Sequence, residues 1–266
     1  MDLNRLKKRL KTSLFGKNIF YFEETESTNV RAMELAKEGA PEGPVVITDF
    51  QTSGKGRLNR DWLSPKSKNM LVSLLLRPEL EVESVQKITL TTAAVLIESI
   101  KGFLKNRKIE FPQMEVKWPN DILVNKKKLA GILAESRLQE KNIEALVLGI
   151  GLNLNMDEPD LPRELMGKAT SVFIESKHHI QIEDLLAFFL KRFEAGYEKA
   201  ERTNYRAAVK QWKKYAGKFN YPILVHTLEG DEKGIFKDVN ENGFLTYENE
   251  SGILKTLIAG EIERIG

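Results

Sequence analysis

A basic, glycine-containing loop between two apolar segments is the feature that most constrains how this chain can fold. Residues 45–50 and 70–76 are apolar enough to be buried strands. The loop after the first strand carries three cations, two glycines and a tryptophan: Lys55, Arg57, Arg60, Gly54, Gly56 and Trp62. Glycine lets a backbone approach a ligand closely, cationic side chains bind phosphate or carboxylate strongly, and an indole can stack on a flat base. Two interpretations stay open: an anion-binding loop beside an aromatic platform, or a solvated basic surface loop.

Two common nucleotide-binding motifs are excluded. A phosphate-binding P-loop needs a glycine five residues before its Gly-Lys pair and a Ser or Thr after it. Asp49 stands at the first of these positions and Gly56 at the second. The Gly149-x-Gly151 start of a dinucleotide fingerprint lacks its third glycine, because Leu154 stands there.

Composition narrows the class of protein. The 266 residues suffice for one large domain, or for a medium domain and a small one. The chain has no cysteine, which excludes disulfides and thiolate metal sites, and its three histidines offer little for a His-based metal site. A net charge of only +3 argues against general nucleic-acid binding. No apolar run is long enough to span a bilayer, and no signal-peptide core is present. We therefore expect a cytoplasmic protein without a membrane partner.

Periodicity predicts helices over residues 2–14, 84–105, 182–197 and about 204–216, and a short strand over residues 19–22. Ser27, Thr28 and Asn29 come between that strand and a further helical segment that ends at Gly39. These residue types cap helices, which is their plainer role. At a strand-to-helix junction they could also face a ligand.

A second polar stretch interrupts the middle of the chain. Lys117, Asn120 and Asp121 surround Pro119, which forbids a regular central strand there. Residues 118–135 then predict a hairpin that carries Asn120, Asp121 and Lys128. A strand over residues 147–155 follows, and alternation places Asn153 and Asn155 on one of its faces.

The pattern predicts an α/β (α+β) fold with two parts. Residues 1–219 are expected to form the larger domain, with a mixed sheet and helices packed on one side, since parallel strands joined by helices occur together with a hairpin. Residues 220–266 contain short β segments separated by turn clusters, which is typical of a small all-β barrel.

Taken together, these motifs resemble the biotin protein ligase family. The resemblance covers residues 19–156 and rests on five motifs in family order: Ser27-Thr28-Asn29, Gln51 with Gly54-Lys55-Gly56-Arg57 through Arg60 and Trp62, Lys117-Trp118-Pro119-Asn120-Asp121, Lys128 with Gly131-Ile132, and Gly149-x-Gly151-x-Asn153. It implies a catalytic domain like that of class II aminoacyl-tRNA synthetases. It also implies the form without the N-terminal DNA-binding module of repressor-type members, so no direct DNA binding is expected.

The resemblance implies a biotin–[acetyl-CoA-carboxylase] ligase that makes biotinyl-5'-adenylate from biotin and ATP. Biotin then passes to a lysine of a biotin carboxyl carrier domain. Arg57 and Lys128 are the implied catalytic residues. The implied biotin-binding residues are Ser27, Thr28, Asn29, Gln51, Lys55, Gly56, Arg57, Lys128 and Gly131. The implied ATP-binding residues are Arg57, Arg60, Trp62, Lys117, Asn120, Asp121, Lys128 and Asn153. Mg²⁺ is the implied metal, with Asp121 as a candidate ligand, and a homodimer is one assembly that the resemblance allows.

The sequence departs from the family pattern at two positions of the basic loop. Lys55 stands where the family usually has arginine, and lysine lacks the planar fork for bidentate contacts. Asn59 stands where glycine is frequent. Asparagine tolerates a left-handed backbone better than most residues, so we expect the loop geometry to be kept.

Two competing functions follow from the same residues. A lipoate or octanoate protein ligase on a related scaffold is the nearer one. A non-catalytic nucleic-acid-binding protein could instead use the basic loop and the C-terminal barrel, but it leaves Asn120, Asp121 and Asn153 without a role.

Overall fold

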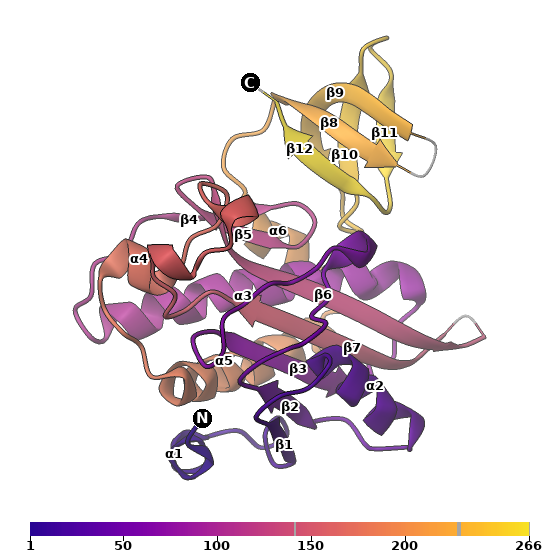
Figure 1. Cartoon of the computed structure of the whole chain (residues 1–266). Coiled ribbons are helices and arrows are strands. Elements are labelled where there is room, and N and C mark those ends of the chain that lie inside the picture. Colours follow the sequence, from indigo (N-terminus) through magenta and orange to yellow (C-terminus); the bar gives the residue numbers. More distant parts are fainter. Residues whose placement is uncertain (141, 228–229, 266) are drawn as a thin grey trace.

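The computed structural model describes residues 1–140, 142–227 and 230–265, which form two β-sheets and the helices around the first (Figure 1). The larger sheet has the strand order β1-β2-β3-β7-β6-β5-β4. Its strands are β1 (Ile19–Phe22), β2 (Val45–Thr48), β3 (Met70–Leu76), β4 (Met114–Lys117), β5 (Asp121–Val124), β6 (Lys127–Gln139) and β7 (Asn142–Leu152). β1 and β2 are parallel and the other neighbours are antiparallel, which confirms the predicted mixed sheet.

Most of the helical mass lies on one face of this sheet, as predicted. The helices there are α1 (Leu3–Arg9), α3 (Val85–Lys105), α5 (Ile182–Arg202) and α6 (Ala208–Lys213), and they share one apolar core with the sheet. The short α4 (Val172–Ser176) adds Val172 to the same core. Alternate residues along the strands supply that core, for example Val45 and Ile47 of β2.

Helix α2 (Thr28–Lys37) is the exception, because it covers part of the opposite face. Its Ala32 and Ala36 pack on Val46 and Leu75, whose side chains point away from the main core. α2 contacts β2, β3 and β7. It therefore presents its N-terminus toward the part of that face formed by β6 and the rest of β7, where the cavity described below lies.

Several predicted element ends are wrong. The first helix stops at Arg9, and Leu10 is its C-cap. Residues Ser13–Phe15 instead donate hydrogen bonds to the Glu194 carboxylate of α5. The last helix of this part is α6, which spans Ala208–Lys213 rather than residues 204–216. β7 ends at Leu152, so the alternation expected to place Asn153 and Asn155 on one face does not continue that far.

Residues from Tyr221 onward form the second sheet, which is antiparallel and has five strands in the order β11-β10-β9-β8-β12. They are β8 (Tyr221–Thr227), β9 (Gly230–Val239), β10 (Leu245–Asn249), β11 (Leu254–Leu257) and β12 (Glu261–Arg264). In the described residues β11 and β12 stand at opposite edges of this sheet, so the predicted small barrel is an open one. The division of the chain at residues 219 and 220 stays a prediction. Across the described ranges, no helix combines the length and apolarity needed to cross a membrane.

Candidate active site

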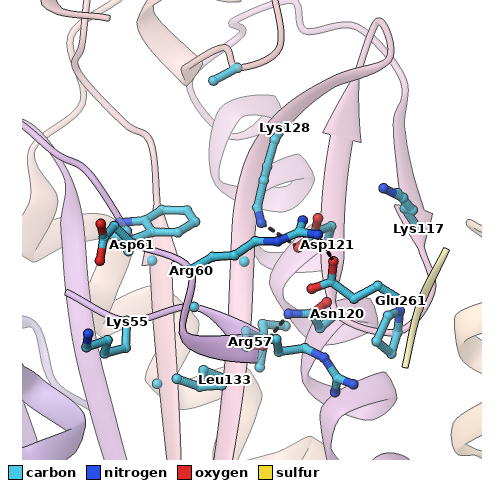
Figure 2. Close-up of a pocket in the computed structure, with 18 of the residues that line it drawn as sticks. Lys55, Arg57, Arg60, Asp61, Lys117, Asn120, Asp121, Lys128, Leu133 and Glu261 are labelled. Atoms are coloured by element: carbon cyan, nitrogen blue, oxygen red, sulfur yellow. Dashed lines mark hydrogen bonds and ion pairs between the residues drawn. The ribbon is translucent and has the colours of Figure 1, made fainter. Parts of the chain in front are cut away.

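A cavity of about 680 Å³ lies on the face of the sheet beyond α2. Its walls are the basic loop Gly54–Trp62, the turn between β4 and β5, and the edge of the C-terminal sheet (Figure 2). Every residue that the sequence singled out for biotin, ATP or catalysis lines this cavity: Ser27, Thr28, Asn29, Gln51, Lys55, Gly56, Arg57, Arg60, Trp62, Lys117, Asn120, Asp121, Lys128, Gly131 and Asn153. The structure thus brings them together, while their individual roles stay predictions.

Glycines form the floor of the cavity and give room for an indole ring. Gly131 of β6 and Gly151 of β7 face each other across the strand pair. A Cβ atom at Gly151 would lie 2.5 Å from Cε2 of Trp62, and one at Gly131 would lie 3.0 Å from its Cζ3. Because a side chain at either position would collide with the ring, these glycines let Trp62 lie against the sheet.

One end of the cavity is neutral and polar. The Gln51 carboxamide oxygen accepts hydrogen bonds from the Thr28 backbone N–H at 2.8 Å and from its hydroxyl at 3.1 Å. Ser73 Oγ lies 2.7 Å from Thr28 Oγ1 and 2.6 Å from Asn29 Oδ1. The Asn29 amide in turn donates to Glu135 at 2.6 Å. This connected network fixes the hydroxyl and amide groups at the N-terminus of α2.

The other end is charged. Nζ of Lys128 lies 2.8 Å from Oδ1 of Asp121, on the neighbouring strand, and 5.4 Å from the centroid of the Trp62 ring. Figure 2 shows the Lys128 and Arg60 side chains converging on the region around Asp121, with Asn120 beside it. Lys128 is anchored by its backbone, since its N–H donates to the Lys168 carbonyl at 2.8 Å and its carbonyl accepts from Thr170 at 2.9 Å.

Arg57 is the half-buried cation of this end. Its Nη2 donates to the Gly260 carbonyl at 3.1 Å. Its Nε is buried and has no hydrogen-bond partner in the described residues. Burial lowers the pKa of Arg57, and the nearby carboxylates of Glu261 and Asp121 oppose this effect. Arginine stays protonated in proteins, so a half-buried guanidinium with an unused Nε donor is suited to bind an anion.

The basic loop is ordered as a small hairpin. Trp62 N–H donates to Gly54 O at 2.8 Å, and Gly56 N–H donates to Arg60 O at 2.6 Å. Arg60 also forms an ion pair of 2.6 Å with Glu261 of β12, so the loop is tied to the C-terminal sheet. The backbone of the loop is left-handed at Leu58, with φ 51° and ψ 38°.

The asparagines of the site are partly engaged by the protein itself. Asn120 Nδ2 donates to Ile132 O at 2.8 Å, which ties the turn after β4 to β6. Asn153 is buried and lies 3.4 Å from both Asn69 Nδ2 and Lys128 O. Asn155 points elsewhere, because its amide binds the backbone of Ile180.

Sequence reasoning missed four residues that shape the site. Ser73 and Glu135 support Asn29, Glu261 binds Arg60, and Lys168 lines the cavity. Ser73 could have been noticed, because it is a hydroxyl in an otherwise apolar strand. Glu261 carries no such signal, since its contact with the loop is set by the packing of the C-terminal sheet.

No cluster of three or more His, Cys, Asp or Glu suitable for a metal ion occurs in residues 1–140, 142–227 and 230–265. Asp121, Asn120 and Asn153 supply one carboxylate and amide groups at the charged end. Mg²⁺ commonly binds through one or two carboxylates together with substrate phosphates. These residues therefore fit a Mg²⁺ ion that arrives with a nucleotide.

Comparison with known proteins agrees with this geometry. Residues 21–153 match the model of the biotin/lipoate A/B protein ligase family. The bifunctional ligase/repressor BirA of Bacillus spizizenii is 33% identical over 96% of this chain and 76% of its own length. The biotin–[acetyl-CoA-carboxylase] ligase of Paracoccus denitrificans is 28% identical over 86% of this chain and 93% of its own length.

Solved structures give the same result. The biotin protein ligase of Aquifex aeolicus in complex with biotin and ATP has a TM-score of 0.77 and 25% identity, covering 94% of this chain and all (100%) of that one. The biotin protein ligase of Leishmania major in complex with biotinyl-5-AMP has a TM-score of 0.59 at 23% identity and supports the fold alone. Its family motifs line one cavity, residues 21–153 match the family model, and a relative is 33% identical over 96% of this chain, so the chain belongs to the biotin/lipoate A/B protein ligase family.

Proposed function

We infer that this protein is a biotin–protein ligase, which activates biotin as biotinyl-5'-adenylate and transfers it to a lysine of a biotin carboxyl carrier domain. The observation that carries this function is the division of a single cavity into a neutral polar end and a cationic end. Biotin has matching parts, a neutral ureido ring and a carboxylate. The relatives named above as biotin ligases support biotin over lipoate as the acid.

The neutral end suits the ureido ring, which offers two N–H donors and one carbonyl acceptor. Ser27, Thr28 and Gln51 present hydroxyl and amide groups there. Gln51 is already oriented by two hydrogen bonds to Thr28, so little reorganisation is needed when the ring binds. Gly131 and Gly151 let the Trp62 ring lie against the sheet, so the indole forms part of the cavity wall.

The first reaction step brings two anions together. A carboxylate oxygen of biotin forms a bond to the α-phosphorus of ATP, the bond from that phosphorus to the bridging oxygen breaks, and pyrophosphate leaves. Arg57 and Lys128 supply the positive charge that reduces repulsion and stabilises the charge on the phosphoryl oxygens. Lys55, Arg60 and Lys117 lie around the cavity, where they add to the cationic surface offered to the phosphates.

Mg²⁺ bound to the phosphates would neutralise the rest of their charge. Asp121, Asn120 and Asn153 are the residues that we propose face it. Asp121 forms an ion pair with Lys128, which holds its carboxylate at the charged end of the cavity.

The second step transfers the acyl group. The neutral amine of the carrier lysine forms a bond to the acyl carbon, the bond from that carbon to AMP oxygen breaks, and the amine nitrogen loses a proton. We propose orienting this amine as the alternative role of Asp121, in place of a role with Mg²⁺. The ordered loop Gly54–Trp62 excludes water, which would otherwise hydrolyse the mixed anhydride.

The test of this function is direct. The purified protein should catalyse biotin-dependent exchange of pyrophosphate into ATP. Mass spectrometry after incubation with biotin and ATP should find retained biotinyl-adenylate. Exchange that depends on lipoate and not on biotin would assign the protein to the lipoate branch. Salt-dependent DNA or RNA binding without any exchange would instead support the nucleic-acid hypothesis.

The cytoplasmic location, the absence of direct DNA binding and homodimer formation are further parts of the proposal. Sedimentation with and without biotin and ATP measures the oligomeric state. A DNA-binding titration in the presence of both ligands checks the second point, and cell fractionation checks the first.

A further inference from the structure

Trp118 is placed at a joint between the cavity wall and the C-terminal sheet. It lies in the turn between β4 and β5 and is 2% exposed. Its ring belongs to the main apolar core, and its Nε1 donates a hydrogen bond of 2.9 Å to the carbonyl of Gly243. A buried indole N–H needs a partner, and this one finds it 125 residues away in the chain.

The partner segment, Asn240–Gly243, is a rigid turn between β9 and β10. Asn240 Oδ1 accepts from the backbone of Asn242 at 3.0 Å and from that of Phe244 at 3.0 Å. Gly243 has a φ of +85°, and a Cβ atom there would lie 3.1 Å from side-chain atoms of Gln86 and Leu90 in α3. The turn is therefore fixed both internally and against α3.

The same joint holds the residues next to Trp118. Gln86 Nε2 donates to the Pro119 carbonyl at 3.2 Å. The backbone carbonyl of Asn120 accepts from Ile132 N–H at 3.0 Å. Asp121 follows directly and pairs with Lys128. The position of the Asp121 carboxylate thus depends on a segment that is anchored at Trp118.

The C-terminal sheet reaches the opposite wall as well. Its Gly260 and Glu261 bind Arg57 and Arg60 of the loop. The C-terminal part therefore contacts both walls of the charged end, at Gly243 on one side and at Gly260–Glu261 on the other.

We propose that Trp118 is a positioning residue, through which the turn Asn240–Gly243 holds the Asn120–Asp121 wall at its working distance from the loop that carries Arg57. The hydrogen bond from Nε1, and not only the bulk of the ring, performs this role. The neutral end of the cavity is built from α2 and Gln51 and does not depend on the joint. The inference rests on the proposed ligase function.

Trp118→Phe tests the proposal, because phenylalanine keeps an aromatic ring in the core and removes the donor. We expect kcat for biotin-dependent pyrophosphate exchange to fall between about tenfold and a hundredfold, the range for displaced supporting groups around a reacting centre. The Kd for biotin alone should change less than about twofold. Trp212→Phe is the matched control. Trp212 is also buried, with 1% of its surface exposed, but its Nε1 has no hydrogen-bond partner in the described residues. It should keep the wild-type kcat.

A second variant keeps the test independent of the ring. Asn240→Ala loosens the turn and leaves Trp118 intact, so it should lower kcat with the same unchanged biotin Kd. The double variant should be no slower than the slower single one, because both act through one joint. An unchanged kcat in Trp118→Phe overturns the proposal, as does an equal loss of kcat and biotin affinity in both tryptophan variants. Absence of any exchange in the wild-type protein would contradict the ligase function itself.

Discussion

Lys128 and Asp121 form an ion pair of 2.8 Å across β5 and β6, at the charged end of the cavity. Nζ of the same lysine also lies over the Trp62 ring, 5.4 Å from the ring centroid. The cation implied in catalysis is therefore held in place before a substrate arrives. A cation that is already oriented stabilises developing charge without reorganisation in the reaction.

Lys128→Ala should abolish most adenylate formation and leave a folded protein. Removing one preorganised charge from such a site typically costs about 3 kcal/mol in the barrier, or about a hundredfold in rate. Biotin-dependent pyrophosphate exchange measures the effect. Lys127→Ala is the neighbouring control and should keep the wild-type rate. Normal exchange in Lys128→Ala would remove this lysine from the mechanism.

Gly151→Ala should weaken ATP binding by displacing the indole ring of Trp62. The new Cβ atom would lie 2.5 Å from the ring, a distance that forces the tryptophan to move. We expect the Kd for ATP, measured by calorimetry, to rise at least about tenfold. In a Trp62→Ala background the same substitution has no ring to displace, so its added effect should be small. Equal effects in both backgrounds would contradict the contact.

The sequence predicted the residues of the site better than their arrangement. The resemblance to the family implied the fifteen residues, all of which line the cavity, whereas residue types alone left the role of the basic loop open. The order of strands was only coarsely predictable. Periodicity distinguishes strands from helices, but it does not show that α2 lies on the face opposite α3.

Long-range packing accounts for what the sequence did not predict. The contacts of Gly260 and Glu261 with the loop, and of Gly243 with Trp118, join segments 125 to 203 residues apart. No local pattern specifies such contacts. The roles of Asn153 and Asn155 differ because β7 ends at Leu152, and strand ends are where pattern reasoning is least precise.

Gly102→Ala should stabilise the protein. Gly102 lies inside α3, where alanine is favoured over glycine by about 1 kcal/mol. The nearest atom to the new Cβ is the flexible end of Arg192 at 3.1 Å. We expect Tm to rise by about 2 °C. Gly196→Ala in α5 is the comparison. Its new Cβ atom would lie 3.0 Å from a methyl group of Val95 in the core, and this crowding should offset part of the gain in stability. A smaller Tm for Gly102→Ala than for Gly196→Ala would contradict this account.

Glu194 should make the free energy of unfolding depend on pH in the acid range. Burial alone would raise the pKa of Glu194, but hydrogen bonds from Ser13, Leu14 and Phe15 outweigh it and hold the pKa below its usual value. A carboxyl group whose pKa is lower in the folded than in the unfolded state stabilises the fold at pH values above its unfolded pKa. This contribution is lost as the pH falls through the pKa of the folded state.

Urea unfolding of Glu194→Gln at a series of pH values tests this. The variant should be less stable than the wild type at pH 7, and the difference should shrink below about pH 4. Glu198→Gln is the control on the same helix, since Glu198 forms only a 3.7 Å pair with the exposed Arg202. It should stay within about 0.5 kcal/mol of the wild type throughout. A constant difference for Glu194→Gln at all pH values would show that the carboxylate charge is not responsible.

Glu261→Gln should loosen the basic loop and expose it to trypsin. The Arg60 side chain is 66% exposed, so its 2.6 Å pair with Glu261 is worth at most about 1 kcal/mol and should weaken with salt. We expect faster cleavage after Lys55, Arg57 and Arg60 in the variant, and a smaller difference from the wild type at 1 M salt. Glu250→Gln, an exposed residue of the same sheet, should be cleaved at the wild-type rate. Biotin with ATP should slow cleavage of this loop in both proteins, because the ligands fill the cavity that the loop covers. Cleavage that is unaffected by saturating ligands would mean that the loop does not close over them.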